Sequence, residues 1–293
     1  MFILDGAIGT ELARRGANTN LPLWSANALV DDPGLVRTLH EEYIAAGADL
    51  ITANTFRTTP RTFRRAGLPD RSAELTQLAV ALANEARNAF PGRTVKIAGS
   101  MGPLEDCYHP ERVPPDDALA AEHALHAQRL AEAGVDMLLL ETMGTSREAE
   151  AACKAAVSTG VPTIVSFLCD AGGNLYDGKP LEEAVRRVEP YHPYALSINC
   201  MSPRIIDRAV ERLRKAASLP FGVYANVGMP GEEREATMQC DVEPEEYAAF
   251  AGRWIDLGAI FVGGCCGTTP EYVRRIRDAF PPAAKDPWSK GKE

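Results

Sequence analysis

The chain lacks the features that mark membrane, nucleic-acid-binding or secreted proteins. None of its apolar runs approaches the ~20 residues of a membrane-spanning helix. Basic residues are outnumbered, with 31 Lys and Arg against 40 Asp and Glu, and the formal net charge is −9. An acidic surface repels phosphate backbones, so we expect no nucleic-acid partner. The opening residues, MFILDG, carry neither the basic segment nor the cleavage site of a signal peptide, which predicts a cytoplasmic protein.

The cysteine content argues against a disulfide framework. Seven cysteines, an odd number, are spread over 293 residues, and a chain of this length buries a large core without cross-links. We expect reduced thiols, some of them available as ligands. Cys107, Cys153, Cys169 and Cys240 are expected to be small packing residues, because an isolated buried cysteine is more often a core residue than a ligand.

The order of the segments predicts the fold. Short apolar runs alternate with longer stretches in which apolar residues recur every three or four positions. Helical crossovers imply parallel strands, and eight strands suffice to close a barrel. The predicted strands are 2–4, 49–53, 95–100, 136–141, 162–167, 194–199, 221–226 and 259–264, and the predicted helices include 34–46, 72–89, 116–133, 146–158, 180–188, 204–216 and 244–256.

An open, doubly wound sheet is the competing architecture. Its fingerprint GxGxxG is missing, since the first predicted strand is followed by DGAIGT. We therefore expect an α/β fold of the (β/α)8 TIM-barrel type over residues 1–280, and a flexible tail over 281–293. The segments 101–116 and 226–243 show no clear periodicity and are expected to be loops; long loops in compact domains are often functional.

Polar residues and thiols follow most of the predicted strands, where a packing role would favour Val or Leu. The active sites of barrel enzymes lie at the carboxyl ends of the strands, so these positions are site candidates. They include Asp5 and Gly6 after the first strand, Asn54, Thr55 and Phe56 after the second, Ser100 after the third, Glu141 and Thr142 after the fourth, Asn199 and Cys200 after the sixth, Asn226 after the seventh, and Cys265 and Cys266 after the eighth.

Three thiols, Cys200, Cys265 and Cys266, are expected to meet at this rim. Three thiolates can hold zinc and leave a fourth tetrahedral position open, which is typical of catalytic zinc. A vicinal redox pair and plain packing residues are alternatives that spacing alone does not exclude. No histidine follows a predicted strand: His40, His123 and His126 fall on predicted helices, as surface or packing residues, and His109 and His192 fall in loops.

Asp5 and Glu141 form a second group. Two carboxylates at one rim can act in general acid–base chemistry or bind an ammonium group. Glu141 ends the apolar run MLLL, where a carboxylate is costly to bury without a partner, and this favours a functional role. For Asp5, capping a helix that begins near Gly9 is an equal alternative.

These groups suit the activation of a thiol substrate. A free thiol has a pKa near ~8.5 and is mostly protonated at neutral pH, whereas binding to Zn²⁺ deprotonates it. A thiolate held in this way can take a methyl group from a donor that carries a good leaving group. The task of the protein is then to align the sulfur, the carbon and the leaving atom.

Eight motifs, in order along nearly the whole chain, resemble the homocysteine S-methyltransferase family. They are DGAIGTEL (5–12), PLWSANAL (22–29), ADLITANTF (48–56), GSMGP (99–103), LLLET (138–142), INC (198–200), YANVG (224–228) and GGCCGTTPEYV (263–273). The last of these, with an upstream NC, is the most specific. The resemblance implies a zinc-dependent (βα)8 barrel that methylates L-homocysteine to L-methionine.

The resemblance also implies roles for individual residues. Cys200, Cys265 and Cys266 match the Zn²⁺ ligands, and with Glu141 they make up the catalytic set. Asp5 and Glu141 match the carboxylates near the substrate amino group, and the backbone of Gly6 and Ala7 would help to hold the amino acid. Asn54, Thr55 and Asn199 would line the pocket, and Gly264 would shape the turn that carries two of the ligands.

The motifs leave the identity of the methyl donor open. PLWSANAL is similar to the branch that uses S-methylmethionine or S-adenosylmethionine, but the loop LEDCYHPERVPPDD is shorter than is usual there, and SFLCDAGGNLYDG also departs from that branch. Two other readings are a betaine-dependent enzyme and a homocysteine-activating subunit of a split methionine synthase, with a cobalamin protein as its partner. A structural or storage zinc site is the non-enzymatic alternative. Nothing in the sequence indicates an oligomeric state.

Overall fold

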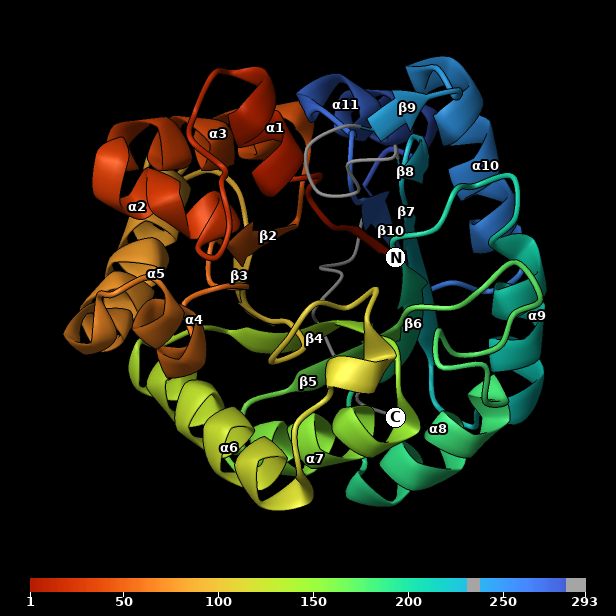
Figure 1. Ribbon diagram of the computed structural model, residues 1–293. Helices are drawn as coiled ribbons and strands as arrows, with labels where there is room; N and C mark the ends of the chain where they lie inside the picture. The colour runs from red at the N-terminus through yellow and green to blue at the C-terminus, as the bar shows by residue number, and fades with distance from the viewer. Residues whose placement is uncertain (231–237, 283–293) are drawn as a thin grey trace.

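Eight parallel strands form one sheet that closes on itself (Figure 1). The computed structural model describes residues 1–230 and 238–282, and the strand order is β1-β10-β7-β6-β5-β4-β3-β2. A parallel bridge between Leu4 and Leu50 and a hydrogen bond of 2.9 Å from the Asp5 amide to the Leu50 carbonyl join the two ends of the sheet. The strands are β1 (Phe2–Ile3), β2 (Leu50–Ala53), β3 (Lys96–Met101), β4 (Met137–Met143), β5 (Thr163–Phe167), β6 (Ala195–Asn199), β7 (Phe221–Ala225) and β10 (Phe261–Gly264).

Helices surround the sheet in Figure 1, and the TIM-barrel prediction is confirmed. Two short helices, α2 and α4, were not predicted, because five or six residues are too few to show a helical period. The helices are α1 (Gly9–Arg14), α2 (Asn27–Asp31), α3 (Pro33–Ala46), α4 (Pro60–Arg65), α5 (Ser72–Asn88), α6 (Asp116–Glu132), α7 (Ser146–Val157), α8 (Leu181–Val188), α9 (Asp207–Ala216), α10 (Pro244–Asp256) and α11 (Pro270–Ala279).

Helix α3 shows how the sequence sets these boundaries. The Asp32 side chain accepts a hydrogen bond of 3.1 Å from the Leu35 amide, and Pro33 occupies the first helical position, where no amide proton is needed. The helix ends at Gly47, whose φ of 116° is a left-handed conformation that favours glycine. The chain then enters β2, so the cap directs the strand into the barrel.

The barrel interior is filled by its own side chains. Phe2 and Phe261 stack with ring centroids 5.0 Å apart, and Tyr224 packs beside them. A Cβ atom on Gly222 would lie 2.3 Å from the Phe261 ring, so this position has to be glycine for the stack to fit. A second, larger apolar layer lies between the sheet and the helices. The interior is therefore packed, and the polar groups gather at the strand ends.

The two segments expected to be loops differ in the structure. Residues 102–115 carry only a 3-10 turn at Pro110–Arg112. The segment 226–243 instead contains a small antiparallel sheet, β8 (Gly228–Pro230) paired with β9 (Met238–Cys240), which was not predicted because strands of three residues show no alternation. Residues 231–237 and most of the expected tail, 283–293, lie outside the described residues.

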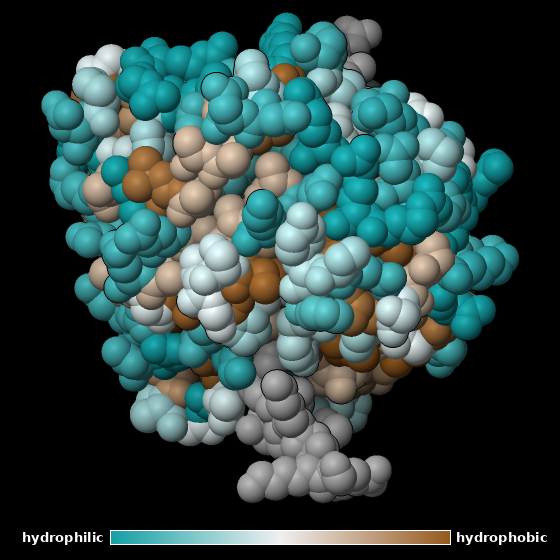
Figure 2. Space-filling model, turned by 90° about the horizontal axis from the view of Figure 1, so that it is seen from below, coloured by the Kyte–Doolittle hydropathy of each residue, from teal (hydrophilic) through white to brown (hydrophobic). Residues whose placement is uncertain are grey.

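Figure 2 shows one side of the molecule, on which hydrophilic residues cover most of the surface and hydrophobic ones form small, separated patches. Within the described ranges, none of the helices has the length and apolar character to cross a bilayer. The predicted cytoplasmic location stays a prediction.

Candidate metal centre and substrate pocket

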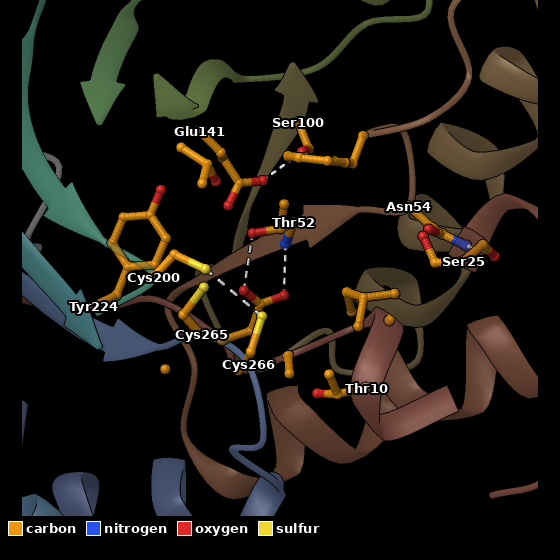
Figure 3. A pocket seen from close by; sticks show the side chains of 18 of the residues that line it. Thr10, Ser25, Thr52, Asn54, Ser100, Glu141, Cys200, Tyr224, Cys265 and Cys266 are labelled. Carbon is orange, nitrogen blue, oxygen red and sulfur yellow. Dashed lines mark hydrogen bonds between the residues drawn. The ribbon is translucent and has the colours of Figure 1, made fainter. Parts of the chain in front are cut away.

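The three thiols predicted to meet do so at one end of the barrel. Cys200 follows β6, and Cys265 and Cys266 follow β10, with β7 between those two strands. Their sulfur atoms all lie within 4.8 Å of one another, and those of Cys200 and Cys266 are 3.8 Å apart. Figure 3 shows the three sulfurs grouped at the edge of the pocket. Two sulfurs at about 2.3 Å from one tetrahedral zinc ion are themselves about 3.8 Å apart, so the cluster has the right size for that ion.

The backbone around the thiols is unusual. Cys200 has a φ of 60°, a left-handed conformation that costs a non-glycine residue of order 1–3 kcal/mol and that marks functional sites. A Cβ atom on Gly264 would lie 2.3 Å from the Thr268 hydroxyl oxygen. That hydroxyl donates to the Cys265 carbonyl at 2.7 Å and accepts from the Ala7 amide at 3.1 Å. Gly264 thus lets Thr268 brace the turn that presents both adjacent thiols, as predicted for a glycine at this turn.

Three polar side chains contact the sulfur or backbone atoms of the three cysteines. Asn226 accepts a hydrogen bond of 3.1 Å from the Cys266 amide, and Asn199 donates to the Cys265 sulfur at 3.8 Å. The Tyr108 hydroxyl lies 3.4 Å from the Cys200 sulfur. Partners of this kind orient metal ligands and tune their charge.

The three thiols strongly affect one another's ionisation. Hydrogen bonds from Cys265 and Cys266 lower the pKa of Cys200 well below its usual value. Cys200 in turn raises the pKa of both Cys265 and Cys266 well above theirs. Ionisation of one thiol therefore opposes ionisation of the other two, and a cation among the sulfurs would be needed for all three to ionise together. A thiolate-binding divalent metal ion such as zinc fits this donor set.

Asp5 lies at the end of β1 and is buried. Its carboxylate accepts hydrogen bonds from the Thr52 amide at 2.6 Å and from the Thr52 hydroxyl at 2.9 Å. Helix α1 begins at Gly9 with Ile8 as its N-cap and no side-chain cap bond, so the alternative role of Asp5 as an N-cap is wrong. Desolvation raises the pKa of Asp5 to about 8, and the nearby Glu141 adds to the rise.

Glu141 projects from an irregular part of β4. The register of β4 against β5 shifts between Leu140 and Met143, and Thr142 has a φ of 62°. Bulges of this kind redirect side chains near active sites. The Ser100 hydroxyl donates to the Glu141 carboxylate, as the dashed line in Figure 3 shows. Desolvation raises the pKa of Glu141 to about 7 despite this bond, so the ionised carboxylate is unfavourable in the unliganded pocket and a bound cation would stabilise it.

The thiols and both carboxylates line one pocket. Of the other predicted substrate residues, Gly6, Ala7 and Asn54 also line it. Thr55 and Asn199 are buried beside it instead. The Thr55 hydroxyl donates to the Ser100 carbonyl at 2.8 Å, and the Asn199 side chain accepts from the Thr142 amide at 3.0 Å. Their contact with a substrate therefore stays a prediction, and in the structure they support neighbouring pocket residues.

Most residues of the outer wall of the pocket could not be predicted from the sequence. It contains Trp24, Phe56, Arg57 and Tyr108. Phe56 follows the second predicted strand, Trp24 lies in the motif PLWSANAL, and Tyr108 lies in the segment 101–116. Nothing in the sequence spacing indicates that these segments meet. Arg57 follows Phe56 directly, and its position one residue beyond the strand-end candidates was the one available signal.

The burial of the remaining cysteines and of the helical histidines tests whether they are packing residues. Cys153 and Cys169 are buried, as expected of packing residues, and the half-buried Cys107 packs against the core and also lines the pocket. Cys240 is exposed, so the packing prediction is wrong for this residue. Cys240 is the last residue of the short strand β9, at the surface of the molecule. The helical histidines, His40, His123 and His126, are buried packing residues.

The pH dependence of the free energy of unfolding tests whether the pKa of Asp5 is raised. Its pKa is raised from 3.8 to about 8, so in the metal-free protein its ionised form destabilises the fold as the pH rises between these values. Asparagine does not titrate. We expect the free energy of unfolding of Asp5→Asn to rise relative to wild type between about pH 4.5 and about pH 9, on the order of a few kcal/mol, as measured by urea denaturation. Asp256→Asn, at an exposed position on α10, is the control. If the difference in free energy of unfolding between Asp5→Asn and wild type were the same at both pH values, this interpretation would be contradicted.

A family model described as homocysteine S-methyltransferase matches residues 2–280. Among curated proteins, homocysteine S-methyltransferase YbgG of Bacillus subtilis (strain 168) is 33% identical, over 94% of this chain and 93% of that protein. Selenocysteine Se-methyltransferase of Brassica oleracea var. italica is 32% identical, over 94% of this chain and 87% of that protein.

Solved structures give the same result. The metallated form of the homocysteine methyltransferase MmuM from Escherichia coli superposes with a TM-score of 0.81 and 32% identity, over 94% of this chain and 96% of that one. The oxidized form of the same protein gives a TM-score of 0.83. Together with the family model that matches nearly the whole chain, these relatives show that the protein is a methyltransferase of the homocysteine S-methyltransferase family.

Proposed function

We propose that the protein methylates the thiol of L-homocysteine to give L-methionine, with zinc bound by Cys200, Cys265 and Cys266 and with an amino-acid sulfonium as methyl donor. The observation that carries this proposal is the presence of a three-thiol cluster and two carboxylates of raised pKa in one pocket. A structural or storage zinc site would need no such pocket and no carboxylates beside the thiols.

The catalytic role of the metal is limited to one contribution. Zinc, when bound, supplies the positive charge that keeps a coordinated thiol deprotonated at neutral pH. The three cysteines hold it and leave a fourth position for a substrate. Asn226 and Asn199 fix the orientation of Cys266 and Cys265 through the bonds described above.

The two carboxylates orient homocysteine. Asp5 and Glu141 are held by Thr52 and Ser100, so their free oxygen lone pairs face a fixed point in the pocket. A substrate ammonium group bound there lowers the raised pKa of both acids by supplying the missing opposite charge. With the ammonium at the carboxylates and the sulfur at the thiols, both ends of homocysteine are held, and the sulfur is positioned for transfer.

The donor side of the pocket is aromatic. Trp24 and Phe56 meet edge to face with centroids 5.8 Å apart, and Tyr108 lines the same pocket beside the thiols. Aromatic faces attract onium cations. In the reaction, the bond between the sulfonium sulfur and its methyl carbon breaks, a bond from that carbon to the homocysteine sulfur forms, and the donor leaves as a neutral thioether. The thiol proton of homocysteine has already been lost to solvent.

A donor panel tests the proposal. Zinc-loaded protein is incubated with homocysteine and, separately, with S-methylmethionine, S-adenosylmethionine, betaine or methylcobalamin, and methionine is measured; metal-stripped protein is the control. We expect methionine with a sulfonium donor. Product with betaine alone would reassign the donor, and product with methylcobalamin alone would make the protein the homocysteine-activating partner of a cobalamin protein. No methionine with any donor would refute the proposal.

A further inference from the structure

The pocket has charges of opposite sign on two parts of its wall. Asp5 and Glu141 come from strand ends and line the pocket together with the thiols. Arg57 lies in the segment between β2 and α4, and among the described residues that line the pocket it is the one with a basic side chain. The Arg57 side chain is half-buried and lines the pocket.

Two contacts place the guanidinium group of Arg57, one to the pocket residue Phe56 and one to the loop that follows β3. Its Cζ atom lies 5.4 Å from the centroid of the Phe56 ring, and Nη1 donates to the Glu105 carbonyl at 3.4 Å. Glu105 belongs to the same loop as Tyr108. Arg57 thus sits against the aromatic surface that suits an onium group and next to the loop that carries the tyrosine at the thiols.

This arrangement matches the charges of an amino-acid sulfonium. Such a donor carries a positive sulfur at one end and a carboxylate at the other, and arginine binds carboxylates in a fixed, two-pronged geometry. We infer that Arg57 binds the carboxylate of the methyl donor and so selects donors that carry one. The inference rests on the proposed function, since homocysteine must already occupy the carboxylates and the thiols.

A pair of donors that differ only at the carboxylate tests the inference. S-methylmethionine and its carboxamide share the sulfonium and the ammonium group, and both are assayed with wild-type protein and with Arg57→Gln at saturating homocysteine. We expect Arg57→Gln to raise KM for S-methylmethionine roughly 10- to 100-fold, the loss of one charge-assisted hydrogen-bond pair, and to leave KM for the amide unchanged. Arg57→Lys should recover part of the loss, because it keeps the charge but not the planar geometry.

Two controls separate this result from a general disturbance. Arg64→Gln, an exposed arginine on the neighbouring helix α4 that does not line the pocket, should change neither KM. The Kd of homocysteine, measured by calorimetry, should be the same in wild type and Arg57→Gln.

The outcomes that overturn the inference are distinct. If Arg57→Gln keeps the wild-type preference for the acid over the amide, Arg57 does not read the donor carboxylate. If instead Arg57→Gln weakens homocysteine binding, the arginine holds the other substrate. If the wild type makes no methionine from any sulfonium donor, the proposed donor class fails and this inference fails with it, whereas either of the first two results leaves the proposed function intact.

Discussion

In the Cys265→Ala variant we expect the zinc to be lost and methionine formation to fall by about three orders of magnitude, while the barrel still folds. At pH 7 a free thiol with a pKa near ~8.5 is only a few per cent ionised, which accounts for a factor of about thirty. Loss of the fixed position of the substrate sulfur adds a factor of about 10². Zinc content by elemental analysis and the initial rate of methionine formation are the two measurements.

The fold should survive because Cys265 is a small side chain at the rim, where it packs only against the edge of the apolar core. Metal-free wild type and metal-free variant are the fair comparison, since bound zinc stabilises whatever it binds. Cys240→Ala, which removes an exposed thiol that does not line the pocket, should keep both zinc and activity. A Cys265→Ala protein that retains one zinc ion and its turnover would show that this thiol is not a ligand.

In the Glu141→Gln variant we expect zinc to be retained and the Kd of homocysteine to rise about 100-fold. Truncating one partner of a buried charge pair typically costs 2–5 kcal/mol, and the lower end of this range applies to a partly exposed carboxylate. Glutamine keeps an oxygen that accepts from Ser100, so the local structure is preserved. Calorimetric titration with homocysteine gives the Kd.

A thiol without an amino group provides the matched probe. 4-Mercaptobutyrate carries the thiol and the carboxylate of homocysteine but no ammonium, so wild type and Glu141→Gln should bind it equally. Equal losses for both compounds would mean that Glu141 acts on the thiol end. Loss of zinc from the variant would show that Glu141 belongs to the metal site.

The strand ends were the part of the site that could be predicted. Each strand is an apolar run with a sharp end, and closure of a parallel barrel brings all such ends to one rim. This sufficed to place Cys200, Cys265 and Cys266 together, with Asp5 and Glu141 beside them in one pocket. Their distances, and the left-handed conformation of Cys200, depend on tertiary packing that no periodicity encodes.

The side chains supplied by connecting segments could not be predicted in the same way. Tyr108 reaches Cys200 from an irregular stretch, 92 positions away in the sequence, and Trp24 comes from a short turn before α2. Neither segment has a repeating pattern that fixes its path. For Asp5 the local sequence left two roles open. An aspartate shortly before a helix is typical of an N-cap, but the buried Thr52 amide and hydroxyl bind its carboxylate instead.

X-ray absorption at the zinc K edge, with and without homocysteine, tests the assignment of the three thiols most directly. Without substrate we expect three sulfur atoms at about 2.3 Å and one lighter atom, and with homocysteine we expect four sulfur atoms. Fewer than three sulfurs in the substrate-free, zinc-loaded protein, or a first shell that homocysteine leaves unchanged, would contradict the assignment of Cys200, Cys265 and Cys266 as ligands of a zinc ion that receives the substrate thiol.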